Sequence, residues 1–266
     1  MSTLVCFHAH PDDEALSTGG LMAKAAAAGH RVILVTATRG EQGEPQPDVL
    51  AEGEELWERR VIEVAEAAEI LGAEPPRFLD YEDSGMMGEP ENDNPACFWQ
   101  ADVGEATERM TAILREVEAD VLTIYDDHGL YGHPDHIQVH RVGLAAAAAA
   151  GVEYVYEATV NRDRAIEGFA EMAEEMAEAG VDAPNVEEFG EFGLPDNQLS
   201  YVLDISAHLK AKREAMRVHR SQIGENSFFL FLPEDRFAQM FANEWYAIPG
   251  GQKTDGPVEV ELLPGL

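Results

Sequence analysis

Basic residues, cysteines and long apolar runs are all scarce in this chain of 266 residues. Only 18 Lys and Arg face 51 Asp and Glu, which gives a net charge of −33, so a surface that neutralises a phosphate backbone is not expected. The two cysteines, Cys6 and Cys97, cannot build a disulfide framework. The longest apolar stretch, residues 142–152, is rich in alanine and too short to span a bilayer. These shortages predict a soluble cytoplasmic protein without nucleic-acid or membrane partners.

The remaining composition is that of an ordinary globular protein. Hydrophobic residues make up 45% of the chain, and one α/β domain of this length can bury a sizeable core. The large negative charge favours solubility and repels anionic polymers, and together with the presence of only four lysines it suits a salt-tolerant or a high-GC organism. The charge by itself indicates no function.

Strand and helix patterns alternate through the first 160 residues. Apolar, β-branched runs predict strands, and apolar residues at three- and four-residue spacing predict helices. The expected strands are residues 3–8, 31–38, 77–80, 121–125 and 153–158, and the expected helices are 14–28, 54–71, 103–118 and 134–150. This alternation implies right-handed crossovers and a mostly parallel sheet with helices on both faces, a Rossmann-like α/β fold.

Other segments are less regular. Residues 40–53 and 81–100 are rich in Gly, Pro, Asp, Asn and Glu, and we expect two long loops of the length that often carries function. Residues 162–180 are rich in Glu and Ala and predict a solvated outer helix. No strand is predicted after Pro195, and the aromatic stretches 228–231 and 245–246 are expected in the core or in a subunit contact.

A histidine and three acids follow the first expected strand, in the run AHPDDE at residues 9–14. In open parallel sheets, ligands bind in the crevice beyond the carboxyl ends of the strands. Asp12 or Asp13 can cap the helix that follows, but capping accounts for only one acid and not for His10. We therefore expect His10 and a carboxylate to face the crevice.

A second group follows the strand at 121–125, in the run YDDHGLYGHPDH at residues 125–136. Pro134 marks the start of a helix, and His133 and His136, three residues apart, share a face. Imidazole and carboxylate suit Zn²⁺ with three protein ligands and an open position for water. The expected ligands are His10, Asp13 and His136, and Fe²⁺ also fits them.

Two residues left beside these ligands have the chemistry for hydrolysis. Asp12 is the expected base for a metal-activated water. His133 is expected to stabilise an oxyanion or to protonate a leaving nitrogen, with Asp135 holding its other ring nitrogen. Tyr131, on a loop flanked by glycines, is expected to donate a hydrogen bond to the same oxyanion.

The paired motifs resemble the LmbE-like family, also called the PIG-L deacetylases. The similarity rests on AHPDDE and on HPDH at residues 133–136, extends to residues 17–20, 38–41, 60–63 and 83–86, and covers roughly the first 150 residues. It implies a zinc-dependent de-N-acetylase on a Rossmann-like fold. The implied substrate is an N-acetylglucosamine compound such as N-acetylglucosaminyl inositol.

The resemblance implies the same ligand and catalytic roles and adds three substrate-binding residues. Arg60 and Asp83 are implied to contact sugar hydroxyls, and Glu44, in the loop after the second expected strand, is implied to bind substrate as well. From the residues alone, Arg60 can equally form a helix-surface ion pair with Glu63, and Asp83 can simply form an Asx turn.

We expect a single domain over residues 1–266. Residues 1–160 form its metal-site core, and residues 161–266 form a more variable part that shapes the pocket. The expected partner is a small amino-sugar substrate, and a homo-oligomer is compatible with the sequence.

Three alternatives differ from this interpretation. An amidase that cleaves a bulkier acyl conjugate, such as a mycothiol S-conjugate, would use the same chemistry. A receiver-like signalling domain needs a lysine at a later strand end and makes no use of His133 or His136. A metal-binding protein without catalysis leaves Asp12 and His133 without a role. Dinucleotide binding is not expected, since no G-x-G-x-x-G follows the first strand.

Overall fold

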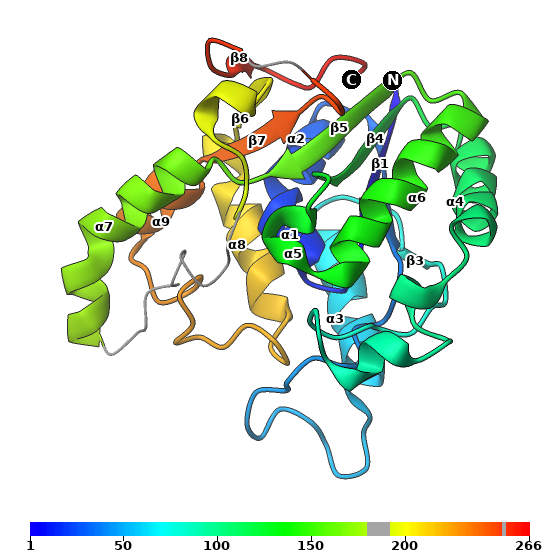
Figure 1. Cartoon of the computed structure of the whole chain (residues 1–266). Helices are drawn as coiled ribbons and strands as arrows, with labels where there is room; N and C mark the ends of the chain where they lie inside the picture. The colour runs from blue at the N-terminus through cyan, green and yellow to red at the C-terminus, as the bar shows by residue number, and fades with distance from the viewer. Residues whose placement is uncertain (180–191, 252–253) are drawn as a thin grey trace.

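The computed structural model describes residues 1–179, 192–251 and 254–266, and Figure 1 shows the chain as a sheet with helices packed on both faces. The described strands are β1 (Thr3–His8), β2 (Arg31–Thr36), β3 (Arg77–Phe78), β4 (Val121–Tyr125), β5 (Tyr154–Thr159), β6 (Tyr201–Asp204), β7 (Asn243–Ala247) and β8 (Val258–Val260). They form one sheet in the order β3-β2-β1-β4-β5-β7-β6-β8. β7 runs antiparallel to β5 and β6, and the other pairs are parallel. The expected Rossmann-like α/β fold is confirmed.

The helices of the described part are α1 (Asp13–Ser17), α2 (Gly19–Ala27), α3 (Leu56–Ile70), α4 (Val103–Val117), α5 (Gly129–Gly132), α6 (Pro134–Ala150), α7 (Arg162–Ala179), α8 (Leu209–Val218) and α9 (Glu234–Phe241). Short 3₁₀ turns are η1 (Pro90–Asp93), η2 (Phe98–Gln100), η3 (Asp196–Gln198) and η4 (Ser206–His208). None of these helices is long and apolar enough to cross a membrane.

The buried side chains form two layers, one on each face of the sheet. Successive residues of β1 point to opposite faces, so Leu4 and Cys6 join one layer and Val5 and Phe7 join the other. α2, α3 and α8 cover the first face, and α4 and α6 pack side by side over the second (Figure 1). Burial on both faces explains why β1 and β2 are continuous apolar runs.

Most element boundaries lie within two residues of their predicted positions, but the predicted helix at 14–28 is broken at Thr18. Thr18 leaves helical geometry at φ −131° and ψ 8°, and its hydroxyl bonds the His8 ring at 2.8 Å. The break lets α2 begin at Gly19. A Cβ on Gly20 would stand 2.6 Å from Ile205, so a larger residue cannot occupy this close contact.

The sequence prediction missed the strands after Pro195. β7, β6 and β8 extend the sheet beyond β5, and the aromatic segment at 245–246 enters the core through Tyr246, which is fully buried. β7 is a five-residue strand that pairs antiparallel to two neighbours, so it lacks the strand–helix repeat that marked the first half. The predicted outer helix at 162–180 is present as α7, and residue 180 lies outside the described residues.

A buried ion pair ties this C-terminal extension to the first helices. Glu244 of β7 accepts hydrogen bonds from Gly20 N at 2.7 Å and Leu21 N at 2.8 Å, at the start of α2. Lys212 of α8 donates to Glu244 at 2.6 Å and to the Leu16 carbonyl at 2.8 Å. Thr18 provides no side-chain cap for α2, so Glu244 satisfies donors that a local cap would otherwise satisfy.

We predict that Lys212→Met lowers the free energy of unfolding by about 3–5 kcal/mol, because it leaves the Glu244 charge buried without its cation. The double variant Lys212→Met, Glu244→Gln should lose less than the sum of the two single variants. Urea unfolding of the three variants measures both effects. A loss below about 1 kcal/mol for Lys212→Met would mean that the pair contributes little.

Candidate metal centre

β1 and β4 are neighbours at the point where the strand order reverses. In a doubly wound sheet this is where ligands bind, beyond the carboxyl ends of the strands. The chain leaving β1 carries residues 9–14 and the chain leaving β4 carries residues 126–136. Parallel pairing therefore brings the two histidine–aspartate motifs together across more than 120 residues of sequence.

The carboxylate of Asp13 joins the two motifs. Its Oδ2 atom lies 3.4 Å from His10 Nδ1 and 3.4 Å from His136 Nε2. All three residues are buried. Ligands about 2.0–2.1 Å from a tetrahedral Zn²⁺ stand about 3.4 Å from one another, so both separations fit the edges of such a site.

The environment of His136 also suits a ligand. Only 1% of this residue is exposed, yet neither of its ring nitrogens has a hydrogen-bond partner within the described structure. Leaving a buried polar atom unpaired is costly, and a metal bond would satisfy one of the two. Tyr125 stacks on the ring at 4.1 Å and 7°, which fixes its plane.

The second ring nitrogen of His10 faces carboxylates. His10 Nε2 lies 3.2 Å from Asp135 Oδ2 and 3.4 Å from Asp83 Oδ1. Ser84 holds Asp135 through its backbone N–H at 3.0 Å and through its hydroxyl. A carboxylate at Nε2 fixes the tautomer and leaves Nδ1 free to bind a metal. Burial disfavours the charged ring, but Asp83, Asp13 and Asp135 together raise the pKa of His10 well above its usual value.

In the described residues, two groups have donor atoms that all lie within 4.8 Å of one another. They are His10 with His133 and His136, and His10 with Asp83 and Asp135. Both are weaker candidates for a ligand set. His133 Nδ1 already accepts the backbone N–H of Asp135 at 3.1 Å, and the Asp135 carboxylate is held by Ser84. Asp13 has one oxygen at ligand spacing from two histidines.

The sequence predicted that the Asp135 carboxylate would hold the His133 ring, and the structure corrects this prediction. The carboxylate contacts the ring of His10, whereas the ring of His133 accepts a hydrogen bond from the backbone N–H of Asp135. Ser84, from the loop after β3, draws this carboxylate toward the end of β1. The orienting acid therefore serves His10.

Asp12 adopts a backbone conformation that is rare outside glycine. Its φ is 107°, a strain of about 1–3 kcal/mol, and its N–H donates to Glu14 Oε2 at 3.0 Å. The Asp12 side chain is 17% exposed, and its Oδ1 lies 3.3 Å from Arg60 Nη2. Burial raises the pKa of Asp12 to about 6 against the opposing effect of Arg60, a value suited to a base near neutral pH.

His133 and Tyr131 lie beside the expected ligands. The His133 ring centre is 4.6 Å from His10 and 5.1 Å from His136. Burial and these two rings lower the pKa of His133 to about 2, so its imidazole is neutral. The ring centre of Tyr131 lies 5.0 Å from that of His136. The preceding residue, Leu130, has a φ of 66°, and its backbone N–H donates to Asp126 Oδ1 at 2.7 Å.

The three residues implied to bind substrate have different surroundings. Arg60 is buried, donates to the carbonyls of Gly40 at 2.9 Å and Pro11 at 2.5 Å, and does not form the alternative ion pair with Glu63. Asp83 accepts from Gly85 N at 2.9 Å, as the Asx-turn alternative expected, while also facing His10.

The third of these residues, Glu44, is exposed on the loop after β2. Glu41 of the same loop accepts the Asp83 N–H at 3.0 Å, and burial raises its pKa. Glu41 therefore reaches the site region, although the sequence analysis did not select it.

Sequence reasoning missed several other residues around the site. Glu14, within the first motif, bonds His219 from the C-terminal part at 2.5 Å, and both are fully buried. His8 bonds the Tyr125 hydroxyl at 2.8 Å, beneath His136. His8 directly precedes the first motif and Glu14 is its last residue, so their place in the sequence is a usable signal. His219 lies 205 positions from its partner Glu14, and no sequence pattern indicates that the two residues meet.

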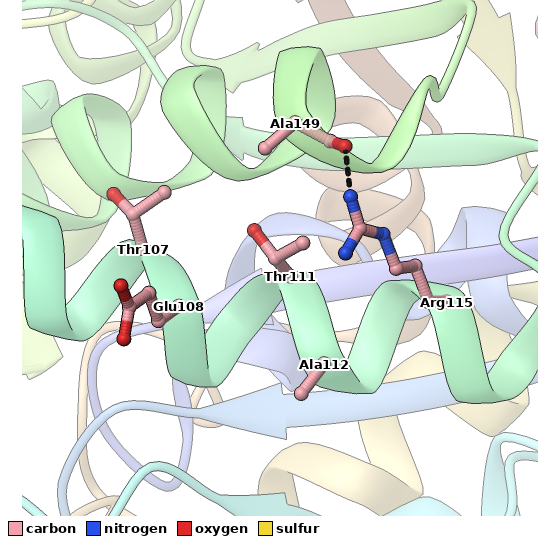
Figure 2. Close-up of a pocket in the computed structure, with 6 residues that line it drawn as sticks. All are labelled: Thr107, Glu108, Thr111, Ala112, Arg115 and Ala149. Atoms are coloured by element: carbon pink, nitrogen blue, oxygen red, sulfur yellow. Dashed lines mark hydrogen bonds between the residues drawn. The ribbon is translucent and has the colours of Figure 1, made fainter.

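A hollow of about 330 Å³ lies elsewhere, against α4 and the end of α6 (Figure 2). It is lined by Thr107, Glu108, Thr111, Ala112, Arg115 and Ala149, and Arg115 donates to the Ala149 carbonyl at 2.6 Å across it. Ala149 stands 13 residues after His136 on one helix, a distance of about 20 Å along the axis. The hollow is therefore separate from the metal centre.

The donor set suits a metal-dependent hydrolase, and comparison with known proteins gives the family of this chain. Residues 5–147 match the family model described as "PIG-L: GlcNAc-PI de-N-acetylase". The chain belongs to this de-N-acetylase family.

One curated relative is the 1D-myo-inositol 2-acetamido-2-deoxy-alpha-D-glucopyranoside deacetylase of Thermomonospora curvata. It is 41% identical over 287 residues, covering 97% of this chain and 95% of the relative. Among solved structures, the N,N'-diacetylchitobiose deacetylase of Pyrococcus horikoshii matches with a TM-score of 0.55 and 23% identity, over 89% of this chain and 73% of the other.

A 4-carboxy-2-hydroxymuconate hydratase from Pseudomonas putida KT2440 also shares the fold. Its TM-score is 0.61 at 18% identity, over 96% of this chain and 99% of the other. The fold alone therefore does not determine the reaction, and the residues of the site must.

We predict that His136→Gln prevents stoichiometric binding of zinc, because it removes one of three proposed ligands. Asp135→Asn should weaken binding by about 10–100-fold, since it alters only the group that orients His10. Metal analysis after dialysis, with zinc titration, measures both. His140→Gln, one turn further along α6, is the matched control and should bind as the wild type does. Full zinc content in His136→Gln would refute the ligand assignment.

Proposed function

We propose that this protein is a zinc-dependent deacetylase that hydrolyses the acetamide of N-acetylglucosaminyl inositol, giving acetate and the free amine. The observation that carries the proposal is Asp13 Oδ2, 3.4 Å from both His10 and His136, with Asp12 on the adjoining turn. The substrate is proposed because relatives with this printed activity match along nearly the whole chain.

His10 Nδ1, Asp13 Oδ2 and His136 Nε2 would hold the metal, and Zn²⁺ suits two imidazoles and one carboxylate. Fe²⁺ fits the same donors. When bound, such an ion polarises the acetyl carbonyl and makes water more acidic. The buried surroundings keep the site's charges close to one another at low effective dielectric.

Asp12 would accept a proton from the water that attacks the acetyl carbon. Its raised pKa places it near neutrality, where a base is both deprotonated and able to hold a proton. Arg60 contacts the Asp12 carboxylate and the preceding carbonyl, so it would also keep Asp12 in place.

His133 and Tyr131 would act on the other side of the scissile amide. A neutral His133 can donate a hydrogen bond to the developing oxyanion. The proton that Asp12 takes from the water would pass to the leaving nitrogen as the C–N bond breaks, which restores the Asp12 carboxylate. Burial raises the pKa of Tyr131, so its hydroxyl stays protonated and can serve as a second donor.

The sugar would lie beside Asp83, with Arg60 and Glu44 as further contacts. Asp83 Oδ1 lies 3.4 Å from Nε2 of His10, one of the proposed ligands. The C-terminal part would complete the pocket, because the Gly193 N–H donates to the Leu130 carbonyl at 2.8 Å, next to Tyr131.

We predict that the zinc-loaded protein releases acetate and amine in equal amounts from N-acetylglucosaminyl inositol. Asp12→Asn should lower kcat by about 10²–10⁴-fold while metal content stays at the wild-type level. Acetate assay, amine labelling and metal analysis on the same samples provide the test. Asp235→Asn, on the exposed start of α9, is the matched control.

Two outcomes would contradict parts of this proposal. Loss of metal in Asp12→Asn would place Asp12 among the ligands. If the metal-loaded protein leaves N-acetylglucosamine compounds intact but cleaves a bulkier acyl conjugate such as a mycothiol S-conjugate, the protein is an amidase with the same catalytic residues.

A further inference from the structure

The backbone at Asp12 needs support from outside its own turn. A φ of 107° is unfavourable for an aspartate, and three contacts oppose its relaxation. The Asp12 carbonyl accepts the first hydrogen bonds of α1, Arg60 holds the Pro11 carbonyl, and the Asp12 N–H donates to Glu14 Oε2 at 3.0 Å. The third contact fixes the direction of the peptide only if the Glu14 carboxylate itself is fixed.

His219 fixes that carboxylate. Its Nε2 lies 2.5 Å from Glu14 Oε1, and both side chains are fully buried. One oxygen of Glu14 therefore faces Asp12 and the other faces His219. The two ends of this contact come from opposite halves of the chain, 205 positions apart.

The position of His219 is itself rigid. It directly follows α8, and its carbonyl accepts hydrogen bonds from Gln222 N at 3.0 Å and Ile223 N at 2.7 Å. Ser221, in the same turn, donates to Glu63 of α3 through its N–H at 3.0 Å and its hydroxyl at 2.6 Å. The turn at residues 219–223 is thus anchored to α3 independently of Glu14.

We propose that His219 is a positioning residue for the catalytic base, acting on Asp12 through Glu14. The inference deepens the proposed function and rests on Asp12 being its base. In the described structure no hydrogen bond or ion pair joins the His219 side chain to the expected ligands or to the residues proposed to bind the sugar, so it should affect how Asp12 is aimed and not how substrate binds. Small misplacements of a catalytic group are costly, about 10²-fold for 1 Å.

Kinetics of His219→Leu and His219→Gln test this inference. The leucine fills space but cannot donate to Glu14, whereas the glutamine amide can donate from the place of Nε2. We expect kcat of His219→Leu to fall by about 10–100-fold with KM and metal content unchanged, and kcat of His219→Gln to stay within about threefold of the wild type. His219→Asn, whose amide is too short to reach Glu14, replaces His219→Leu if that variant does not fold.

Tyr156→Phe is the matched control, because it removes the hydrogen bond of a buried side chain, to the Pro264 carbonyl at 2.9 Å, that leads neither to His219 nor to Asp12. Its kcat should match that of the wild type. An equal fall in Tyr156→Phe, an unchanged kcat in His219→Leu, or a rise in KM in place of the fall in kcat would each overturn the inference.

A crystal structure of His219→Leu tests the positioning of Asp12 independently of turnover. We expect Asp12 to leave the positive-φ conformation or its carboxylate to move away from Arg60. An unchanged Asp12 would overturn the inference even if the enzyme acts as proposed. A displaced Asp12 would support the inference even if the wild type released no acetate, so failure of the proposed function remains distinguishable.

Discussion

The parallel pairing of β1 with β4 is the constraint on which the rest of the site depends. It places the ends of two strands side by side where the strand order reverses, and each end leads at once into a motif of histidine and aspartate. Asp13 then stands at ligand spacing from His10 of its own motif and from His136 of the other. A shift of either strand by one residue would turn these side chains to opposite faces.

Burying so many ionisable groups in one place requires that each be compensated. His10 lies among Asp13, Asp83 and Asp135, Asp12 faces Arg60, and Glu14 pairs with His219. Charges removed from water are tolerated when paired and hydrogen-bonded, and a cation at the site would neutralise the excess of carboxylates further. The same paired groups contact Asp12 and its backbone, so charge compensation and the geometry proposed for catalysis belong to one arrangement.

Local patterns predicted the part of the fold that local forces determine. β1 and β4 are continuous apolar runs, and Pro134 marks the start of α6, so these elements and the meeting of their motifs follow from sequence. Three features do not follow from the sequence: the antiparallel β7, the partner of Glu14 and the direction of the Asp135 carboxylate. Each depends on a residue distant in the chain, and no periodicity records which distant residues will meet.

Anomalous diffraction at the zinc edge, from crystals of the zinc-loaded protein, tests the central claim most directly. The account predicts one ion bonded at about 2.0–2.2 Å to His10 Nδ1, Asp13 and His136 Nε2, with Asp12 beside it and unbonded. An ion held by His133, or by the Asp83 and Asp135 carboxylates in place of Asp13, would contradict it.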